Sequence, residues 1–295
     1  MEIPLLIKGS VIGIVAPSHI ASAERYGRIV PELERLGFRV KLGENVYKTT
    51  YGYLASERER AGDFNAMVAD ETVNMVLFGG GEGGNELLPY IDFERVRENP
   101  KFYCSFSDGT TILNAIHART GLPVFYGQGP GMFYDLRQFD YRHFCARFIE
   151  GKPREFLHTG RWLPLTEGSA DGTLIGGYTR NFALLLGSRY FSYDEDGRYL
   201  LFLEDHEKFS GVAEVSSYLS HIEQSGFIRR VTGLLFGHYA PDVPQHLLNR
   251  LERFGRAHGI PVVYCDAFGH SDDRHGILPI GVRGGLDGGG LRFLG

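Results

Sequence analysis

The chain alternates short apolar runs with segments in which apolar residues recur at helical spacing. The apolar runs are short enough for strands, and the longest of them show no polar alternation, which is typical of parallel strands buried on both faces. Helical spacing is seen over residues 23–36, and Ser56 followed by Glu59 forms a capping-box pattern that predicts a helix toward Val68. The predicted strands cover residues 11–16, 38–42, 73–78, 102–104 and 122–126. This alternation predicts an α/β fold with an open parallel sheet and helices on both faces.

The pattern changes after about residue 150. Residues 152–171 combine proline, glycine and Trp162 without a clear period, which indicates a linker or loop. Strand-like runs and one helical stretch then return, at residues 172–175, 199–203, 212–224 and 231–236. We therefore expect an N-terminal α/β domain over residues 1–150, a linker over 151–171, and a smaller mixed α/β C-terminal domain over 172–295.

Composition narrows the class of protein. Hydrophobic residues make up 43% of the 295 residues and charged residues 23%, as in a soluble globular protein. A formal net charge of -5, without a cluster of lysine and arginine, argues against a nucleic acid polymer as partner. The three cysteines are widely spaced, which favours reduced thiols, and neither a signal peptide nor a membrane-spanning run is visible. We expect a cytoplasmic protein with no membrane partner.

The segment around Ser107 carries the strongest chemical signal. A predicted buried strand from Phe102 ends in Ser-Phe-Ser-Asp-Gly, and a helix-like segment over residues 111–118 follows at once. A serine at a tight strand-to-helix turn points outward beside the amides of the opening helix, as in the nucleophile elbow G-x-S-x-G. Here Ser105 stands where the first glycine would be. The pattern predicts a hydrolase in which Ser107 is the nucleophile.

A serine hydrolase also needs a base and an acid that orients it. His270 follows a short predicted strand in a polar loop and is the best placed of the eleven histidines, while His206 and His275 stay open as candidates. Glu204 ends the apolar run 200–203, where its carboxylate could face a cleft between domains. The order Ser, Glu, His is also that of the α/β-hydrolases.

The glycine run over residues 79–84 follows a predicted strand and allows three interpretations. Gly79, Gly81 and Gly84 fit G-x-G-x-x-G, so one alternative is a nucleotide-binding protein without hydrolytic activity. Another is that the missing side chains let backbone amides approach a developing oxyanion. The third is a flexible turn.

Seven short motifs in the same order resemble the LD-carboxypeptidase family of serine peptidases, which includes the microcin C immunity proteins. The resemblance covers nearly the full length. The motifs are Ala16-Pro17-Ser18, residues 87–92, Phe106-Ser107-Asp108-x-Thr110, Gly176-Gly177, residues 202–205, Gly269-His270 and residues 278–281. The resemblance implies Ser107 as nucleophile, His270 as general base and Glu204 as its orienting acid. It also implies an oxyanion hole formed by the amides of Gly80 or Gly81 and of Asp108.

The family resemblance further implies two domains that share the triad, a homodimer, and chemistry without a metal or organic cofactor. Two features differ from the murein-processing members: the glycine loop lacks their arginine, and no Pro-Tyr pair follows Glu204-Asp205. Residues 83–88, which include Asn85, and the spacing from Glu204-Asp205 to Lys208 resemble the immunity proteins more closely. The expected substrate is therefore a murein peptide or an aminoacyl nucleotide. Asn85, Lys208 and a base-stacking Trp162 are candidate binding residues.

Overall fold

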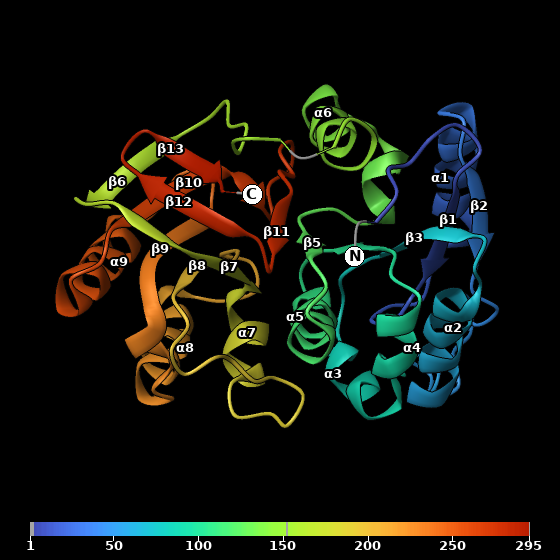
Figure 1. The fold of residues 1–295 in the computed structure, drawn as a ribbon, viewed down its shortest axis with the longest axis horizontal. Helices are drawn as coiled ribbons and strands as arrows, with labels where there is room; N and C mark the ends of the chain where they lie inside the picture. Colours follow the sequence, from blue (N-terminus) through green and yellow to red (C-terminus); the bar gives the residue numbers. More distant parts are fainter. Residues whose placement is uncertain (1–2, 152, 295) are drawn as a thin grey trace.

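The computed structural model describes residues 3–151 and 153–294, and these form two sheets that lie side by side (Figure 1). The strands are β1 (Val11–Val15), β2 (Arg39–Leu42), β3 (Val73–Phe78), β4 (Phe102–Ser105), β5 (Val124–Tyr126), β6 (Trp162–Thr166), β7 (Ala170–Tyr178), β8 (Tyr199–Glu204), β9 (Val231–His238), β10 (Val262–Gly269), β11 (Leu278–Ile280), β12 (Arg283–Asp287) and β13 (Gly290–Phe293). The α-helices are α1 (Ala23–Arg35), α2 (Glu57–Ala69), α3 (Gly84–Leu87), α4 (Phe93–Glu98), α5 (Gly109–Thr120), α6 (Gln138–Phe144), α7 (Thr179–Leu185), α8 (Val212–Gln224) and α9 (Gln245–His258). Shorter helical turns cover Leu88–Tyr90, Pro130–Tyr134, Cys145–Ile149 and Phe227–Arg230.

The N-terminal sheet has the order β11-β5-β4-β3-β1-β2, and its strands β1 to β5 are parallel. Successive residues of β3 pack into different cores. Met75 and Leu77 lie in the core that contains residues of α1, whereas Val76 and Phe78 lie in the core that contains residues of α2. Both faces are therefore apolar, which is why these strands lack polar alternation. The predicted parallel sheet with helices on both faces is confirmed.

The capping box predicted at Ser56 is present at the start of α2. The Ser56 hydroxyl accepts a hydrogen bond from the Glu59 backbone N–H at 3.3 Å. The Glu59 carboxylate in turn accepts one from the Ser56 N–H at 2.8 Å. Two amides that have no partner within the helix are thereby satisfied.

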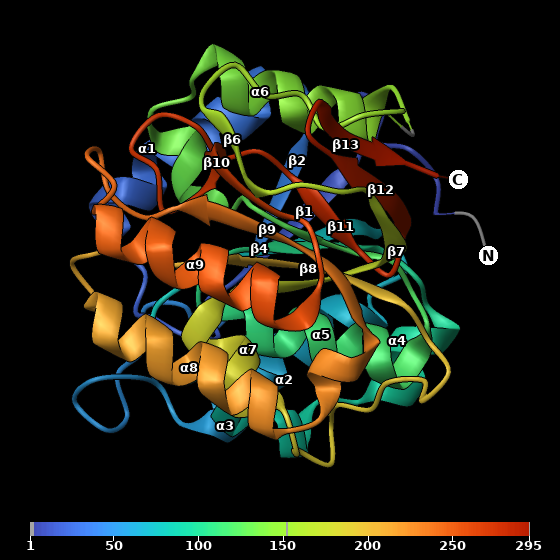
Figure 2. The same cartoon turned by 90° about the vertical axis from the view of Figure 1, so that its left-hand side faces the viewer.

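The C-terminal sheet has the order β13-β12-β7-β8-β9-β10-β6, with a parallel centre of β7 to β10 and antiparallel strands at both edges. Helices α8 and α9 lie next to one another along one face (Figure 2). The prediction of a mixed α/β C-terminal half is confirmed. Residues 162–166, which the sequence suggests as loop or linker, form edge strand β6 on β10. An edge strand tolerates Pro164, but a proline within an apolar run argues against a strand, so the sequence pattern does not predict β6.

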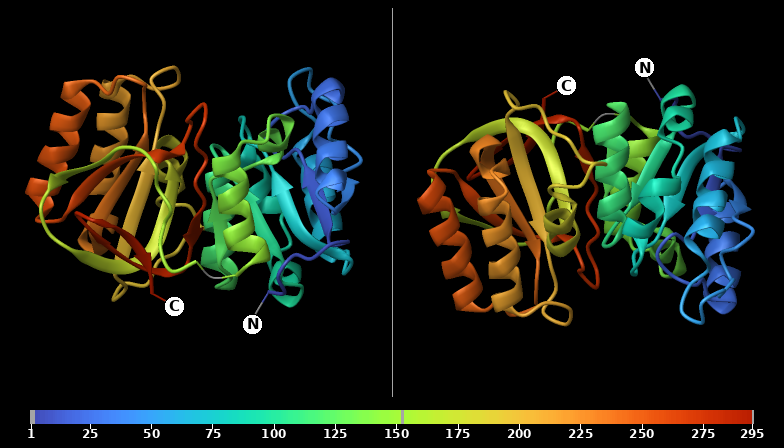
Figure 3. Two further views of the ribbon diagram at one scale, coloured as in Figure 1. Left: turned by 90° about the horizontal axis from the view of Figure 1, so that it is seen from above. Right: turned by 90° about the horizontal axis from the view of Figure 1, so that it is seen from below.

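The two halves are joined around α5. The Asn114 side chain donates to the Gly176 carbonyl at 2.9 Å, and the Tyr178 N–H donates to the Thr110 hydroxyl at 2.8 Å. Gly177 lies at φ +135, and a methyl group there would overlap the Thr110 hydroxyl. The late strand β11 also pairs with β5 of the N-terminal sheet, so the stretch that contains it, drawn in red, runs between the halves (Figure 3). The carboxyl ends of β4, β8 and β10 are thereby brought together.

Within the described residues, no helix has the length and apolar character needed to span a membrane.

Candidate active site

Ser107 lies in the turn between β4 and α5 with φ +55, and it is the one non-glycine residue of the described chain with a positive φ. A left-handed conformation is costly for a residue with a side chain and is held here by the strand and helix on either side. The structure also explains Ser105 at the first glycine position of the motif. Ser105 is fully buried, and its hydroxyl lies where a side chain on Gly109 would be. Gly109 therefore makes room for Ser105, and the tight turn is kept.

Ser107, His270 and Glu204 are hydrogen bonded in sequence. The Ser107 Oγ lies 2.9 Å from His270 Nε2, and His270 Nδ1 lies 2.8 Å from Glu204 Oε2. The backbone N–H of His270 donates to the same carboxylate oxygen at 3.2 Å. Because an ionised carboxylate only accepts, Nδ1 carries the proton and Nε2 accepts from the serine hydroxyl. This tautomer is the one required to remove a proton from Ser107.

The environment of His270 makes it a stronger base than a free imidazole. Burial lowers the pKa of His270, but the charge and hydrogen bond of Glu204 and the charge of Asp205 outweigh that effect, so the pKa lies above 6.5. Glu204 itself is fully buried. A buried carboxylate beside the imidazole stabilises the imidazolium that forms when a proton is taken up.

The glycine loop after β3 lies against Ser107. A methyl group on Gly80 would lie 2.5 Å from the Ser107 Cβ. In the described chain, the amides of Gly80, Gly81 and Asp108 donate to no protein oxygen. The Asp108 carboxylate ties the loop to the turn, because it accepts from the Gly84 N–H at 2.6 Å. The glycine loop and the turn that carries Ser107 and Asp108 therefore lie against each other, and both contain backbone amides without a protein acceptor in the described chain.

A cleft of about 710 Å³ opens in front of Ser107 and His270. Three cationic side chains line it, namely Arg25, Arg180 and Lys208. Arg180 is paired with Glu82 at 3.1 Å, whereas Lys208 has no ion-pair partner among the described residues. The cleft therefore combines a serine, a base and positive charge.

The LD-carboxypeptidase N-terminal domain matches residues 12–127, and the LD-carboxypeptidase C-terminal domain matches residues 171–286. This chain belongs to the LD-carboxypeptidase family. The family resemblance of the motifs is thus confirmed, and with it membership of a family of serine peptidases.

Curated relatives and solved structures agree with this assignment. The "Probable murein peptide carboxypeptidase" of Bacillus subtilis is 30% identical over 96% of this chain and 90% of its own length. The microcin C7 self-immunity protein MccF of Escherichia coli is 26% identical over 79% of this chain and 76% of its own. The crystal structure of an MccF-like protein from Bacillus anthracis superposes with a TM-score of 0.85 and 25% identity, covering 98% of this chain and 97% of that one.

In this LD-carboxypeptidase family member, the other candidate binding residues lie in different places. Lys208 lines the cleft, as do Gly80 and Gly81. Asn85 is exposed on α3 and does not line the cleft. Trp162 is also absent from the lining: it lies on edge strand β6, with its ring stacked on His158 at 4.6 Å between centroids. The position of Trp162 is determined by the pairing of β6 with β10, two strands that are far apart in the sequence. The residue type alone therefore does not predict it.

Four other histidines, His117, His143, His206 and His275, have structural partners. His117 Nδ1 bonds the Leu122 carbonyl at 3.0 Å, and His143 Nε2 bonds that of Leu157 at 2.8 Å. His275 Nδ1 lies 2.9 Å from Asp140, while His206 Nδ1 accepts from the Lys208 N–H at 3.0 Å. Of the histidine candidates, His270 is the one whose imidazole bonds Ser107.

Sequence reasoning missed three residues at the site. Tyr126 ends β5 and contacts both Ser107 and Glu204 through its hydroxyl. Asn181 donates to the Asp108 carboxylate at 2.6 Å, and Phe209 lines the cleft with 64% of its surface exposed. A tyrosine that ends a buried parallel strand was a usable signal, because its hydroxyl reaches the edge of the sheet where ligands bind. Asn181 depends on a contact between the halves, and Phe209 on the packing of its ring beside His206 and His270.

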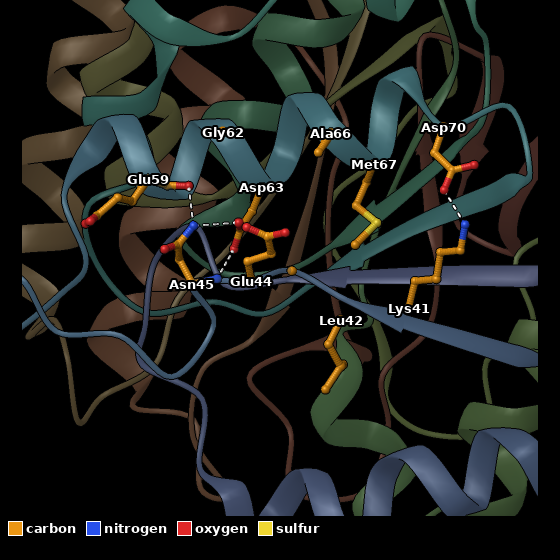
Figure 4. Close-up of a pocket in the computed structure, with 11 residues that line it drawn as sticks. Lys41, Leu42, Glu44, Asn45, Glu59, Gly62, Asp63, Ala66, Met67 and Asp70 are labelled. Carbon is orange, nitrogen blue, oxygen red and sulfur yellow. Dashed lines mark hydrogen bonds and ion pairs between the residues drawn. The ribbon is translucent and has the colours of Figure 1, made fainter.

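A second hollow, of about 600 Å³, lies between β2 and α2 (Figure 4). Three of its four acidic side chains are engaged locally: Asp63 accepts from the Asn45 amide groups, Asp70 pairs with Lys41, and Glu59 pairs with Lys48. Serine, cysteine and histidine are absent from its lining. Across residues 3–151 and 153–294, no group of three or more histidine, cysteine and acidic side chains is arranged to hold a metal ion. The cleft at Ser107 is therefore the candidate active site.

Proposed function

We propose that this protein is a serine peptidase or amidase that hydrolyses a small peptide or peptidyl conjugate with a free carboxylate or other acidic group. Ser107 is the nucleophile, His270 the general base and Glu204 the acid that orients it. One observation carries this assignment: Ser107 Oγ lies 2.9 Å from His270 Nε2, on a turn where φ is +55. A strained serine that is hydrogen bonded to an imidazole with a carboxylate behind it is the arrangement of an activated nucleophile.

The reaction has two stages. Ser107 Oγ attacks the substrate carbonyl carbon while its proton passes to His270 Nε2, and a tetrahedral oxyanion forms. His270 then gives that proton to the leaving amine, the C–N bond breaks, and an ester to Ser107 remains. Water, deprotonated by His270, attacks the ester, and the acid product leaves with the serine proton restored.

The oxyanion is stabilised by backbone donors in this proposal. The amides of Gly80 or Gly81 and of Asp108 are the donors, since they belong to loops that flank Ser107 and have no protein acceptor in the described chain. Such donors hold a developing negative charge without reorganisation. Removal of one comparable donor costs about 10²–10³ in kcat in well-studied hydrolases.

The substrate is either a murein peptide, cleaved at an L,D-peptide bond, or an aminoacyl nucleotide, cleaved next to its terminal aspartyl residue. One relative is named a probable murein peptide carboxypeptidase and another a microcin C7 self-immunity protein, so the chain has a relative in each branch of the family. We favour the aminoacyl nucleotide on the basis of Lys208, which follows Glu204-Asp205 at the spacing of the immunity proteins and lines the cleft. Its ammonium would meet an acidic group, and the exposed ring of Phe209 would offer an apolar face to a base.

The test compares both substrates with purified wild type and Ser107→Ala, together with a fluorophosphonate that traps active serines. We expect wild type to turn over the aminoacyl nucleotide and to be labelled at one serine. Ser107→Ala should fold normally and lose several orders of magnitude in rate and all labelling. Ser217→Ala is the matched control, because that exposed hydroxyl donates to a carbonyl within α8.

Each outcome decides a different part of the proposal. Full activity in a folded Ser107→Ala variant would remove the mechanism, and cleavage of the murein tetrapeptide alone would reverse the preferred substrate. Thermal stabilisation by NAD or ATP, with neither turnover nor labelling, would favour the nucleotide-binding alternative, which the family membership disfavours. A cytoplasmic location and a homodimer also belong to the proposal, and light scattering of the purified protein tests the dimer.

A further inference from the structure

The hydroxyl of Tyr126 connects the nucleophile to the acid by a route that avoids His270. It accepts a hydrogen bond from the Ser107 backbone N–H at 3.0 Å and donates one to Glu204 Oε1. The other oxygen of Glu204 bonds His270, which bonds Ser107 Oγ. Together the four residues form a closed ring of hydrogen bonds.

The direction of each bond in this ring is fixed by chemistry. A backbone amide only donates and an ionised carboxylate only accepts, so the single proton of the phenol must point toward Glu204. Burial, followed by the charge of Glu204, raises the pKa of Tyr126 well above 10, which keeps the phenol protonated. Tyr126 is fully buried at the end of β5, whereas Glu204 comes from the other half of the chain.

We propose that Tyr126 is a positioning residue that fixes the strained backbone of Ser107 and the carboxylate of Glu204 at the same time. Ser107 precedes α5, so its backbone N–H has no acceptor within the helix and depends on the Tyr126 hydroxyl. Without the phenol this donor would be unpaired, which is costly in a site shielded from water. The phenol also satisfies the Glu204 oxygen that His270 does not use. Tyr126 does not line the cleft, so it acts on the triad rather than on the substrate.

This role predicts a particular kinetic signature for Tyr126→Phe. Phenylalanine keeps the ring and its packing, so substrate binding and KM should stay within about twofold. The Ser107 turn becomes less well fixed, and kcat should fall about 10- to 100-fold. Glu204 then accepts one hydrogen bond fewer, so its negative charge is less well neutralised and favours the protonated form of His270 more strongly. The acidic limb of the kcat/KM profile should therefore move to higher pH.

A fluorinated variant should move the same limb in the opposite direction. Replacement of Tyr126 by 3-fluorotyrosine keeps the hydroxyl but makes it a stronger donor, which withdraws charge from Glu204 and should shift the limb to lower pH. The 3-fluorotyrosine variant also allows the proposal to be tested if Tyr126→Phe does not fold. The other titratable or charged groups around His270 are the same in both variants: Asp205, His206, Tyr178, Lys208 and Arg180.

The matched control is Tyr103→Phe. Tyr103 is fully buried on neighbouring strand β4, and its hydroxyl has no hydrogen-bond partner among the described residues, so loss of that hydroxyl should leave kcat, KM and the pH profile unchanged. Equal losses in both phenylalanine variants, or an unshifted acidic limb in the Tyr126 variants, would overturn the role of Tyr126. This inference rests on the proposed function, which has its own readout: wild type that neither reacts with a fluorophosphonate nor turns over substrate would refute the function itself.

Discussion

Gly80 lies so close to Ser107 that a methyl group on its α-carbon would be 2.5 Å from the Ser107 Cβ and 3.3 Å from the Phe106 carbonyl oxygen. The glycine loop and the nucleophile turn are therefore built against each other without room for a side chain. Contacts between carbon atoms do not occur at 2.5 Å in real structures, so one of the loops would have to move.

Gly80→Ala should therefore reduce activity much more than stability. The alanine side chain pushes the loop away from Ser107, and the amides proposed to hold the oxyanion move with it. We expect kcat to fall about 100-fold, comparable to the loss of one oxyanion donor, with little change in Tm. Steady-state kinetics and thermal unfolding measure both.

Gly27→Ala is the control for this change. Gly27 lies in α1 with open space around its α-carbon, so the variant should keep wild-type kinetics and gain slightly in helix stability. A Gly80→Ala protein with wild-type kcat would show that the glycine loop takes no part in the chemistry.

The pH dependence of activity should report the raised pKa of His270. In its proposed role as general base, His270 must be neutral, and the carboxylate of Glu204 favours its protonated form. Activity should therefore fall as pH decreases through a midpoint above 6.5. Glu204→Gln removes the negative charge that stabilises the protonated imidazole, so the midpoint should move to lower pH while kcat falls by about 10⁴. A midpoint that is the same in both proteins would contradict the pairing.

The sequence allowed prediction of features that depend on neighbouring residues. The turn at Ser107 follows from a buried strand, a Ser-Asp-Gly stretch and a helix, all within residues 102–118. The capping box at Ser56 and the parallel strands of the first half are equally local, and the structure contains them.

Features that depend on distant parts of the chain were not predictable in this way. Tyr126 and Glu204 are 78 residues apart, and only the packing of two sheets joins them. Trp162 was a candidate for base stacking because of its residue type, but the pairing of β6 with β10 takes it out of the cleft lining. Hydrophobic periodicity specifies which face of an element is buried, but it contains no information about which distant element covers that face.

Asp205 should make the stability of the protein dependent on pH. Burial, followed by the charge of Glu204, raises the pKa of Asp205 to about 7, whereas an unfolded aspartate has a pKa near 3.8. At pH values between these two pKa values, the folded state therefore holds a proton on Asp205 that the unfolded state has released. The associated stability is present below the unfolded pKa and is lost as pH rises through about 7.

Asp205→Asn keeps this position neutral at every pH. The variant should be more stable than wild type at pH 8, by about 2–4 °C in Tm for each kcal/mol recovered, and the difference should disappear near pH 4. Calorimetry at several pH values measures it. Parallel stability curves for the two proteins would mean that folding does not shift the pKa of Asp205.

Lys208 should determine affinity for acidic substrates rather than the rate of the chemical step. It lines the cleft, and within the described chain its ammonium has no ion-pair partner, unlike Arg180, which Glu82 already neutralises in part. Lys208→Met keeps much of the side-chain length but removes the charge. We expect KM for a substrate with a free carboxylate to rise about 10- to 100-fold, as for loss of a charge-assisted hydrogen bond, with kcat within a few-fold of wild type.

An amidated substrate separates this effect from general damage to the cleft. Without its negative charge the substrate should bind wild type and Lys208→Met about equally, because the ammonium acts as a point charge on the anion. Lys8→Met, at an exposed position outside the cleft lining, should change neither substrate. If Lys208→Met weakened both substrates to the same extent, the lysine would contribute through its alkyl chain, and recognition of the acidic group would have to come from Arg25 or Arg180.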